Sequence, residues 1–195
     1  MKKVTIKYKK MGVIQLEIKK SINAGEIFER LIEEEDITVN QLSFDIGVSP
    51  QMGSHIKNDR RPLQKDIAKR AINVFNDCPA FVMDLIFEFS SGFTPPVLRG
   101  KAIEQHRLSF KHFLLKEWTD VYGRINSEEF DWCKPSDEAS KAEKDWLKDL
   151  IIELNEVEMA AANFRRHLHE AYLINPKQVR DETLTRIKAK GWVEA

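Results

Sequence analysis

The sequence predicts a mainly α-helical protein with two helical domains, and three observations support this fold class. Apolar residues recur at helical spacing over most of the 195-residue chain. Residues that break helices gather at one place, around Pro95 and Pro96. Clear period-two alternation is confined to the N-terminus. We therefore predict a β-hairpin extension over residues 1–22, a five-helix domain over residues 23–90 and an all-helical domain with one long helix over residues 101–195.

The N-terminal alternation predicts a hairpin that turns at Met11-Gly12, with Val4, Ile6 and Tyr8 before the turn and Ile14, Leu16 and Ile18 after it. An isolated hairpin is marginal in water, so this one must pack on the protein or on a second copy. Seven lysines lie in the first 20 residues. They could follow DNA phosphates or protect an exposed strand edge, and both interpretations stay open.

In the first domain, Asn23 and Glu26 resemble a capping box that opens a helix. The other four helices are expected at about 39–46, 50–58, 63–76 and 79–89. In the second domain, we expect helices from about Lys101 to Tyr122, from Ser136 to about Leu173 and from Pro176 through Ile187. Gly123 and the polar pair Asn126-Ser127 would end the first of these, Ser136 would cap the second and Asn175 would open the third.

Residues 37–62 fit the pattern of a helix-turn-helix. This motif needs an apolar contact and a small residue on its first helix, a bend, a cap, and an apolar anchor on its second helix. In that order, the candidates are Leu42, Ser43, Gly47, Ser49 and Ile56, with Val48 pointing inward and Pro50 in the first position of the second helix.

At these residues the chain resembles the phage-repressor type of helix-turn-helix, the Cro/C1 or XRE family. The resemblance covers residues 23–75, about a quarter of the chain, and its most specific parts are residues 47–49, 54–58 and 60–62. It implies that residues 50–58 enter the major groove of double-stranded DNA. Gln51, Ser54 and His55 would then face base edges, and Gln51 is best placed for a paired contact with adenine. The residues expected at DNA bases and phosphates are Thr38, Asn40, Ser49, Gln51, Ser54, His55, Lys57, Asn58, Arg60, Arg61 and Lys65.

Three residues depart from the family pattern. Val39 stands where the family usually has a polar residue that contacts phosphate. Gly53 stands where a branched apolar residue normally packs, and glycine inside a helix costs about 1 kcal/mol relative to alanine, so we expect a less rigid recognition helix. Asp59 replaces the glycine expected after that helix; aspartate tolerates the left-handed conformation, but its charge would lie close to phosphates.

The long helix carries an apolar heptad seam, formed by Leu147, Leu150, Leu154, Val157, Ala161, Phe164, Leu168 and Ala171. The seam could form a homodimer, which a repressor-type protein needs to span two half-sites about 34 Å apart. It could instead pack on the helix of residues 101–122, since Trp146, Ile151 and Ile152 broaden the apolar stripe. Both interpretations stay open.

Composition limits the other function classes. Apolar residues make up 42% and charged residues 32%, which suits a folded chain, and Lys plus Arg equal Asp plus Glu at 31 each. Two cysteines without a CxxC spacing, and the lack of a secretory leader, favour the cytoplasm. We expect no membrane span, cofactor, metal or enzymatic activity, because no phosphate loop, nucleophile elbow, carboxylate pair or metal-binding histidine spacing occurs.

The leading hypothesis is a cytoplasmic, dimeric transcriptional regulator of prokaryotic or phage type. Repression is favoured because covering a promoter requires binding alone. The C-terminal domain would assemble subunits or receive a protein or small-molecule effector. Two alternatives remain: a phage DNA-packaging or replication subunit that uses the helix-turn-helix, and an adaptor that binds protein.

Overall fold

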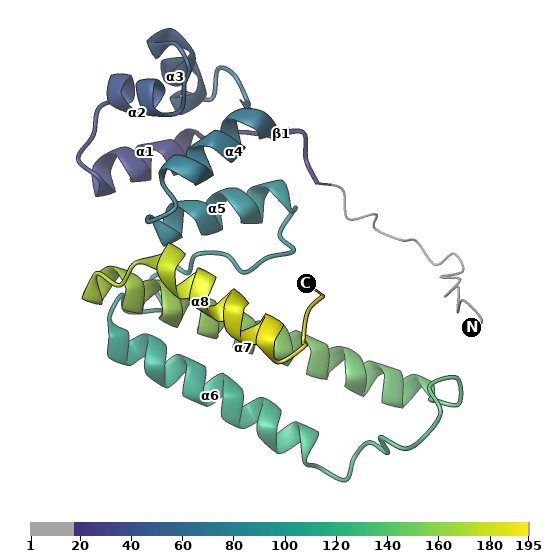
Figure 1. Ribbon diagram of the computed structural model, residues 1–195. Helices are drawn as coiled ribbons and strands as arrows, with labels where there is room; N and C mark the ends of the chain where they lie inside the picture. Colours follow the sequence, from purple (N-terminus) through teal and green to yellow (C-terminus); the bar gives the residue numbers. More distant parts are fainter. Residues whose placement is uncertain (1–17, 195) are drawn as a thin grey trace.

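The computed structural model describes residues 18–194, and it confirms the mainly helical class (Figure 1). The predicted hairpin of residues 4–18 falls outside the described residues, except for Ile18. Five helices form an N-terminal layer, and three more form a C-terminal layer against it, with α5 lying next to α7. The N-terminal helices are α1 (Gly25–Glu34), α2 (Val39–Asp45), α3 (Pro50–Lys57), α4 (Lys65–Val74) and α5 (Pro79–Phe89).

A two-stranded antiparallel sheet joins the start of the N-terminal layer to α4. Strand β1 (Ser21–Ile22) pairs with β2 (Leu63–Gln64), and Ile22 lies opposite Leu63. Both of these apolar side chains are buried in the core. The helix predicted at 63–76 therefore begins only at Lys65, because its first two residues are in the strand pair, and the core extends to Ile22, ahead of the predicted start at residue 23.

The core of the N-terminal layer is aromatic and aliphatic, and it lies between α1, α3 and α5. Phe81 of α5 contacts the rings of Phe28 and Phe75, with ring centroids 6.2 and 5.8 Å apart. Leu31, Leu42 and other apolar side chains complete a single buried cluster. Burial of this size is the main force that holds short helices such as α2 and α3 in place, because helices of their length are unstable alone.

The predicted Asn23 cap of α1 is wrong. The residue that precedes the first turn is Ala24, which has no capping side chain. The amide of Gly25 instead donates to Oδ1 of Asp59, 2.8 Å away, so the cap comes from the loop after α3. Gly25 allows this approach, since a Cβ there would lie 2.6 Å from the Lys57 carbonyl oxygen. A distant residue therefore satisfies the free amide that a helix start exposes.

The C-terminal layer consists of α6 (Arg107–Ile125), α7 (Lys141–Tyr172) and α8 (Pro176–Ala189). Helices α6 and α7 form an antiparallel hairpin: the Phe110 ring near the start of α6 lies 5.4 Å from the His167 ring near the end of α7. At the other end, Arg124 forms an ion pair with Glu153 at 2.9 Å. Helix α8 begins with the predicted Asn175 cap, whose Oδ1 accepts from the Gln178 amide at 3.0 Å.

The predicted start of α6 is wrong, whereas the second of its two predicted stop signals, Asn126-Ser127, is confirmed. The helix begins at Arg107 rather than Lys101, because His106 caps it by accepting a hydrogen bond from the Leu108 amide at 3.2 Å. It also continues past Gly123, since one glycine weakens a helix without ending it. The end comes at Ile125, after which the side chain of the capping residue folds back onto the helix.

The predicted cap of α7 is also wrong. Ser140, rather than Ser136, caps the helix, because only Ser140 has a glutamate three residues later. The Ser140 amide donates to Glu143 at 2.7 Å, and the Glu143 amide donates to the Ser140 hydroxyl at 3.2 Å. The hydrogen bonds from Ser140, together with one from Lys134, lower the pKa of the Glu143 carboxyl to about 2.

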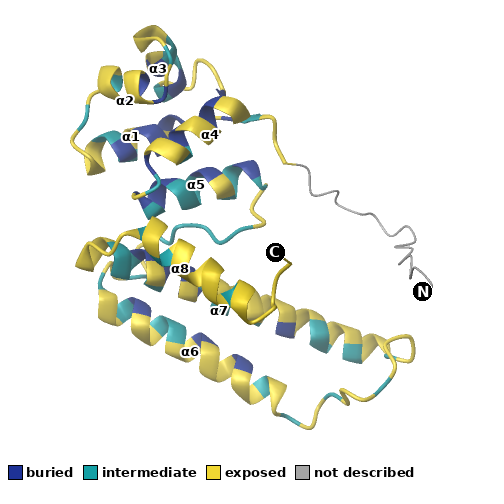
Figure 2. Cartoon of the chain, viewed as in Figure 1, coloured by how far each residue is buried: buried dark blue, intermediate teal, exposed yellow. Residues whose placement is uncertain are grey.

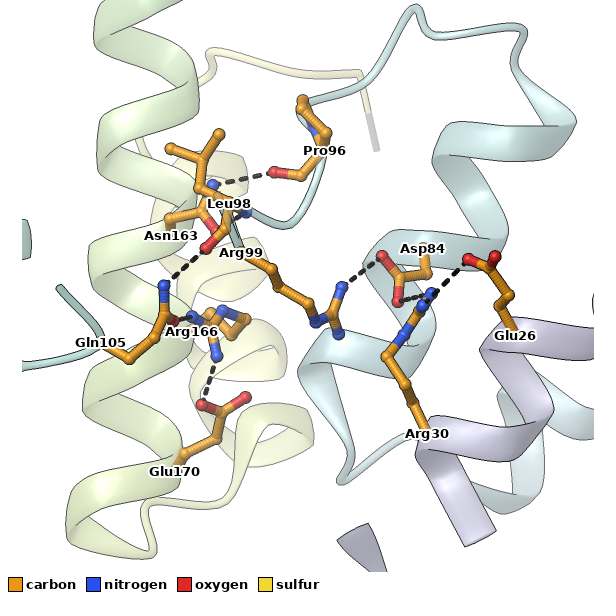
Figure 3. A network of polar contacts seen from close by, with 10 residues as sticks. All are labelled: Glu26, Arg30, Asp84, Pro96, Leu98, Arg99, Gln105, Asn163, Arg166 and Glu170. Atoms are coloured by element: carbon orange, nitrogen blue, oxygen red, sulfur yellow. Dashed lines mark hydrogen bonds and ion pairs between the residues drawn. The ribbon is translucent and has the colours of Figure 1, made fainter. Parts of the chain in front are cut away.

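The two layers are joined through a network of polar contacts (Figure 3). The fully buried Asn163 of α7 accepts a hydrogen bond from the Leu98 amide at 2.9 Å and donates one to the Pro96 carbonyl at 2.9 Å. In α5, Asp84 accepts from Arg30 of α1 at 3.1 Å and from Arg99 of the linker at 2.9 Å. The linker is therefore fixed on both sides, by α7 and by α5.

We expect Asn163→Ala to lower the free energy of unfolding by about 1–3 kcal/mol, because buried linker amide and carbonyl groups are left without their partners. Asn155→Ala, on an exposed part of the same helix, should change it by less than about 0.5 kcal/mol. Urea denaturation measures both, and equal values for the two variants would contradict the role given to Asn163.

Candidate nucleic-acid interface

Helix α2 is held at its start by a complete capping box. The Thr38 hydroxyl accepts a hydrogen bond from the Gln41 amide at 3.2 Å, and the Thr38 amide donates to Oε1 of Gln41 at 2.7 Å. The hydroxyl of Thr38 keeps its own hydrogen free to donate. Thr38 and Asn40 are both accessible to solvent, so the two predicted phosphate contacts on α2 can be reached by another molecule.

The turn between α2 and α3 has the geometry that the sequence predicted. Gly47 has a φ of +68°, which suits glycine, and the Val48 amide closes the turn by donating to the Ser43 carbonyl at 2.9 Å. Ser49 caps α3 by accepting from the Met52 amide at 3.2 Å. Pro50 occupies the first turn, and Ile56 is fully buried as the anchor.

Gly53 has a clear structural reason in this protein. It is buried against Ser43 of α2, and a methyl group at position 53 would overlap the Ser43 hydroxyl. That hydroxyl is itself fixed, because it donates to the Val39 carbonyl at 2.6 Å. Gly53 therefore has a packing role beside the expected loosening of α3: the residue lets two backbones approach closely, and the contact holds α3 against α2.

The outer edge of α3 presents three polar side chains, one in its first turn and two in its second half. Gln51 and Ser54 are exposed and His55 is half-buried, whereas Gly53 and Ile56 on the opposite side are buried. Figure 2 shows the same division along α2 and α3. Within residues 18–194, the Gln51 side chain has no hydrogen-bond partner, so its amide can form a paired contact with another molecule.

The predicted phosphate-binding residues after α3 divide into free and occupied groups. Arg60 and Arg61 are exposed and form no ion pair with any described residue, and their backbone amides fold back onto the His55 carbonyl at 2.8 and 3.2 Å. Lys65, at the start of α4, is exposed as well. Lys57 is occupied, because it forms an ion pair with Glu29 of α1 at 3.1 Å.

Two more residues near the end of α3 are used within the protein. The Asn58 side-chain amide donates to the Ser54 carbonyl at 2.7 Å, so it closes the end of α3. Asp59 takes the expected left-handed conformation, with a φ of 53°. Its carboxylate accepts a hydrogen bond at the start of α1, and this contact gives Asp59 a structural role.

Phe44 is a surface feature that the sequence patterns above did not single out. It lies on α2, near the turn, and 84% of its surface is exposed, the second-largest exposure among the large apolar residues described. Its position gives a signal that could have been noticed: Leu42, Ser43 and Ile46 form the buried side of α2, which leaves Phe44 outside that stripe. An exposed aromatic residue of this kind suits contact with another macromolecule.

The heptad seam of α7 is divided between two faces. Arg124 of α6 lies over the Trp146 ring and pairs with Glu153, and Phe110 contacts His167. Helical spacing places Leu150, Val157 and Phe164 on this same side, toward α6. Leu147, Leu154, Ala161 and Leu168 lie at the edge of that contact. Part of the predicted dimer seam is therefore used inside the chain, as in the intramolecular alternative.

A cleft of about 890 Å³ lies between the two layers, where the ends of α1 and α7 meet the start of α5. It is lined by acidic and basic groups, among them Glu34, Arg99, Arg166 and Glu170. Burial raises the pKa of the Glu34 carboxyl and of the Cys78 thiol. A protonated thiol is a poor nucleophile, so the cleft presents a polar surface rather than a reactive thiolate.

Within the described range, no three histidine, cysteine or acidic side chains are placed to hold a metal ion, and no helix has the length and apolarity to cross a bilayer. Comparison of the chain with protein-family models, with curated proteins and with solved structures found no match.

We expect Gly53→Ala to lower the free energy of unfolding by about 1–3 kcal/mol, because the methyl group forces α2 and α3 apart. The matched control is Gly123→Ala in α6, where the new methyl meets nothing within 4 Å and alanine's helix propensity should raise stability by up to about 1 kcal/mol. Thermal unfolding of the two variants decides the point, and a stabilised Gly53→Ala protein would contradict the close contact.

Proposed function

We propose that the protein is a sequence-specific DNA-binding regulator that uses α3 as its recognition helix. The observation that carries the proposal is the outer edge of α3, where Gln51 and Ser54 are exposed and His55 is half-buried. The opposite side of the helix is held against the core by Gly53 and Ile56. Major-groove recognition requires such a helix, with polar side chains near its N-terminal end.

The charge around α3 supports the same proposal. Although the whole chain is neutral, the free guanidinium groups of Arg60 and Arg61 lie directly after α3, and Lys65 follows. Phosphate contacts from such residues would give affinity and register, while Gln51 and its neighbours would read base edges. Thr38, Asn40 and Ser49 have hydroxyl or amide groups at the starts of the two helices, where phosphates commonly bind.

Repression is the simplest regulatory action for such a protein, since it requires only that the bound protein covers a promoter. The cleft between the layers gives an effector a place to act on the DNA-binding layer. Because the linker and α5 are joined by Asp84 and Arg99, a ligand in the cleft would touch elements that contact α1. Cytoplasmic location remains part of this proposal.

A second candidate function is binding to another protein through the same surface. The exposed ring of Phe44 favours it, because DNA backbone contact needs no large apolar side chain at that position. The two candidates differ in the role of charge: DNA binding depends strongly on salt and on Arg60 and Arg61, whereas an aromatic protein contact depends on Phe44.

Replacing both Arg60 and Arg61 with alanine should weaken binding to all duplexes alike. The slope of log affinity against log salt should become shallower by about 1 for each arginine that no longer neutralises a phosphate. Fluorescence anisotropy with a labelled random duplex measures both quantities. The control is Arg186→Ala with Lys188→Ala in α8, which removes the same charge far along the chain. If the double variant of Arg60 and Arg61 binds duplexes as this control does, the result would count against DNA binding.

Gln51→Ala should relax the preference at one base pair of each half-site by about 1–3 kcal/mol, while leaving the affinity for unrelated duplexes unchanged. Selection of bound sequences from a random library, followed by titration of single-base variants, gives this preference. Gln64→Ala, an exposed glutamine in β2, is the control. If the Gln51 variant selects the same sequence as the parent with the same discrimination, α3 does not read DNA in the proposed orientation.

A further inference from the structure

The hairpin of α6 and α7 carries large apolar side chains that remain in solvent. On α6, these are Leu115, Trp118, Tyr122 and Ile125, and on α7 they are Ile151 and Leu154. Their exposed fractions lie between 41% and 61%. Leu147 and Ala161 extend the α7 row at helical spacing. We call these eight residues the hairpin face.

Helix geometry places both rows on one side of the hairpin. On α6, the row is rotated around the helix axis by about a quarter of a turn from the buried residues Phe110 and Val121. On α7, the row follows the α6-facing residues Leu150 and Val157 by about the same angle. The two helices run antiparallel. A row that is rotated by the same angle from the contact side of each helix therefore lies on the same side of the hairpin. Pairing of Arg124 with Glu153 also puts Tyr122 and Ile125 at the level of Ile151 and Leu154.

The area of the hairpin face is comparable with that of a dimer interface. Aromatic side chains bury roughly 150–250 Å² each when fully covered, and the leucines and isoleucines of the row are smaller. The six half-exposed side chains therefore offer at most on the order of 600 Å² per copy. Specific interfaces bury about 800 Å² per partner. Scattered apolar residues are normal on a surface, but an apolar patch of several hundred Å² is often functional.

We infer that the hairpin face binds the same face of a second copy of this chain, so that two hairpins form a four-helix bundle. The face is two helices wide, and a second hairpin offers two rows of the same length and composition. A twofold interface needs only such a self-matching patch. Zero net charge means that two copies do not repel each other as a whole.

This inference rests on the proposed function in one respect, because a twofold dimer would present two α3 helices to two half-sites of DNA. It also corrects the dimer surface expected from the sequence. Leu150, Val157 and Phe164 of the heptad seam face α6, and the dimer uses Leu147, Leu154 and Ala161 with the exposed row of α6. Trp118 and Tyr122 have a central place in the row from α6, and large aromatic residues at the centre of an interface contribute most to binding.

The test is the mass of the protein in solution, measured by sedimentation equilibrium on the full chain. The parent should be a dimer at micromolar concentration, and Trp118→Glu with Leu154→Glu should be a monomer with unchanged circular dichroism. The matched control is Phe93→Glu with Leu173→Glu, which adds the same charge at residues 71% and 92% exposed away from the face, and it should remain a dimer. A monomeric parent, or a double variant that stays dimeric, would overturn the inference.

Two further measurements keep the outcome clear. If the double variant unfolds, Ile151→Ser alone should weaken dimerisation at least about tenfold, and no change in its dimer dissociation constant would count against the hairpin face. DNA binding separates the two proposals. A monomeric variant should still bind random duplex with the parent's salt slope but bind a twofold site more weakly, whereas a parent that is a dimer and fails to bind any duplex would refute DNA recognition alone.

Discussion

Helices α2 and α3 can touch backbone to backbone because Ser43 and Gly53 face each other, and the orientation of α3 depends on this contact. Any larger residue at position 53 would push α3 outward. The Ser43 hydroxyl is already bonded to the Val39 carbonyl, so the small residue brings no unsatisfied polar group into the contact. With Ile56 buried below, α3 has one stable orientation, and its polar edge faces outward. The proposed DNA contacts all assume that orientation.

The loop after α3 connects this unit to α1. Asp59 caps the start of α1, and Lys57 pairs with Glu29 on the same helix. These groups would otherwise add an acidic and a basic side chain to the surface beside α3. Their use inside the protein leaves Arg60 and Arg61, directly after α3, without an ion-pair partner among the described residues. Because one acidic and one basic side chain are used together, the local balance of charge does not change, and Arg60 and Arg61 supply a positive excess beside α3 although the chain as a whole is neutral.

The C-terminal layer links the proposed DNA-binding, dimer-forming and effector-binding parts of the protein through direct contacts. Asn163 fixes the linker to α7, while Asp84 fixes it to α5 and α1, so the hairpin is held against the N-terminal layer. A pair of hairpins would thus hold two recognition helices in a defined relation. The polar cleft lies at the same junction, where an effector could change that relation. Short polar contacts at such a junction depend on geometry more strongly than apolar packing does. If the two partners separate, a buried polar group is left without a hydrogen bond.

The sequence by itself determined the helical class, the turn at Gly47, the Ser49 cap, and the buried positions of Leu42 and Ile56, because each depends on residues close together in the chain. Local signals failed where two similar signals competed or where the partner was distant. Ser136 and Ser140 could both cap, and the glutamate that follows Ser140 decided between them. Only the tertiary structure showed that Asp59 caps α1, that Gly53 fits Ser43, that Lys57 is paired and that part of the α7 seam faces α6. Each of these depends on residues brought together from different elements, and spacing along one helix contains no information about which neighbour its faces will meet.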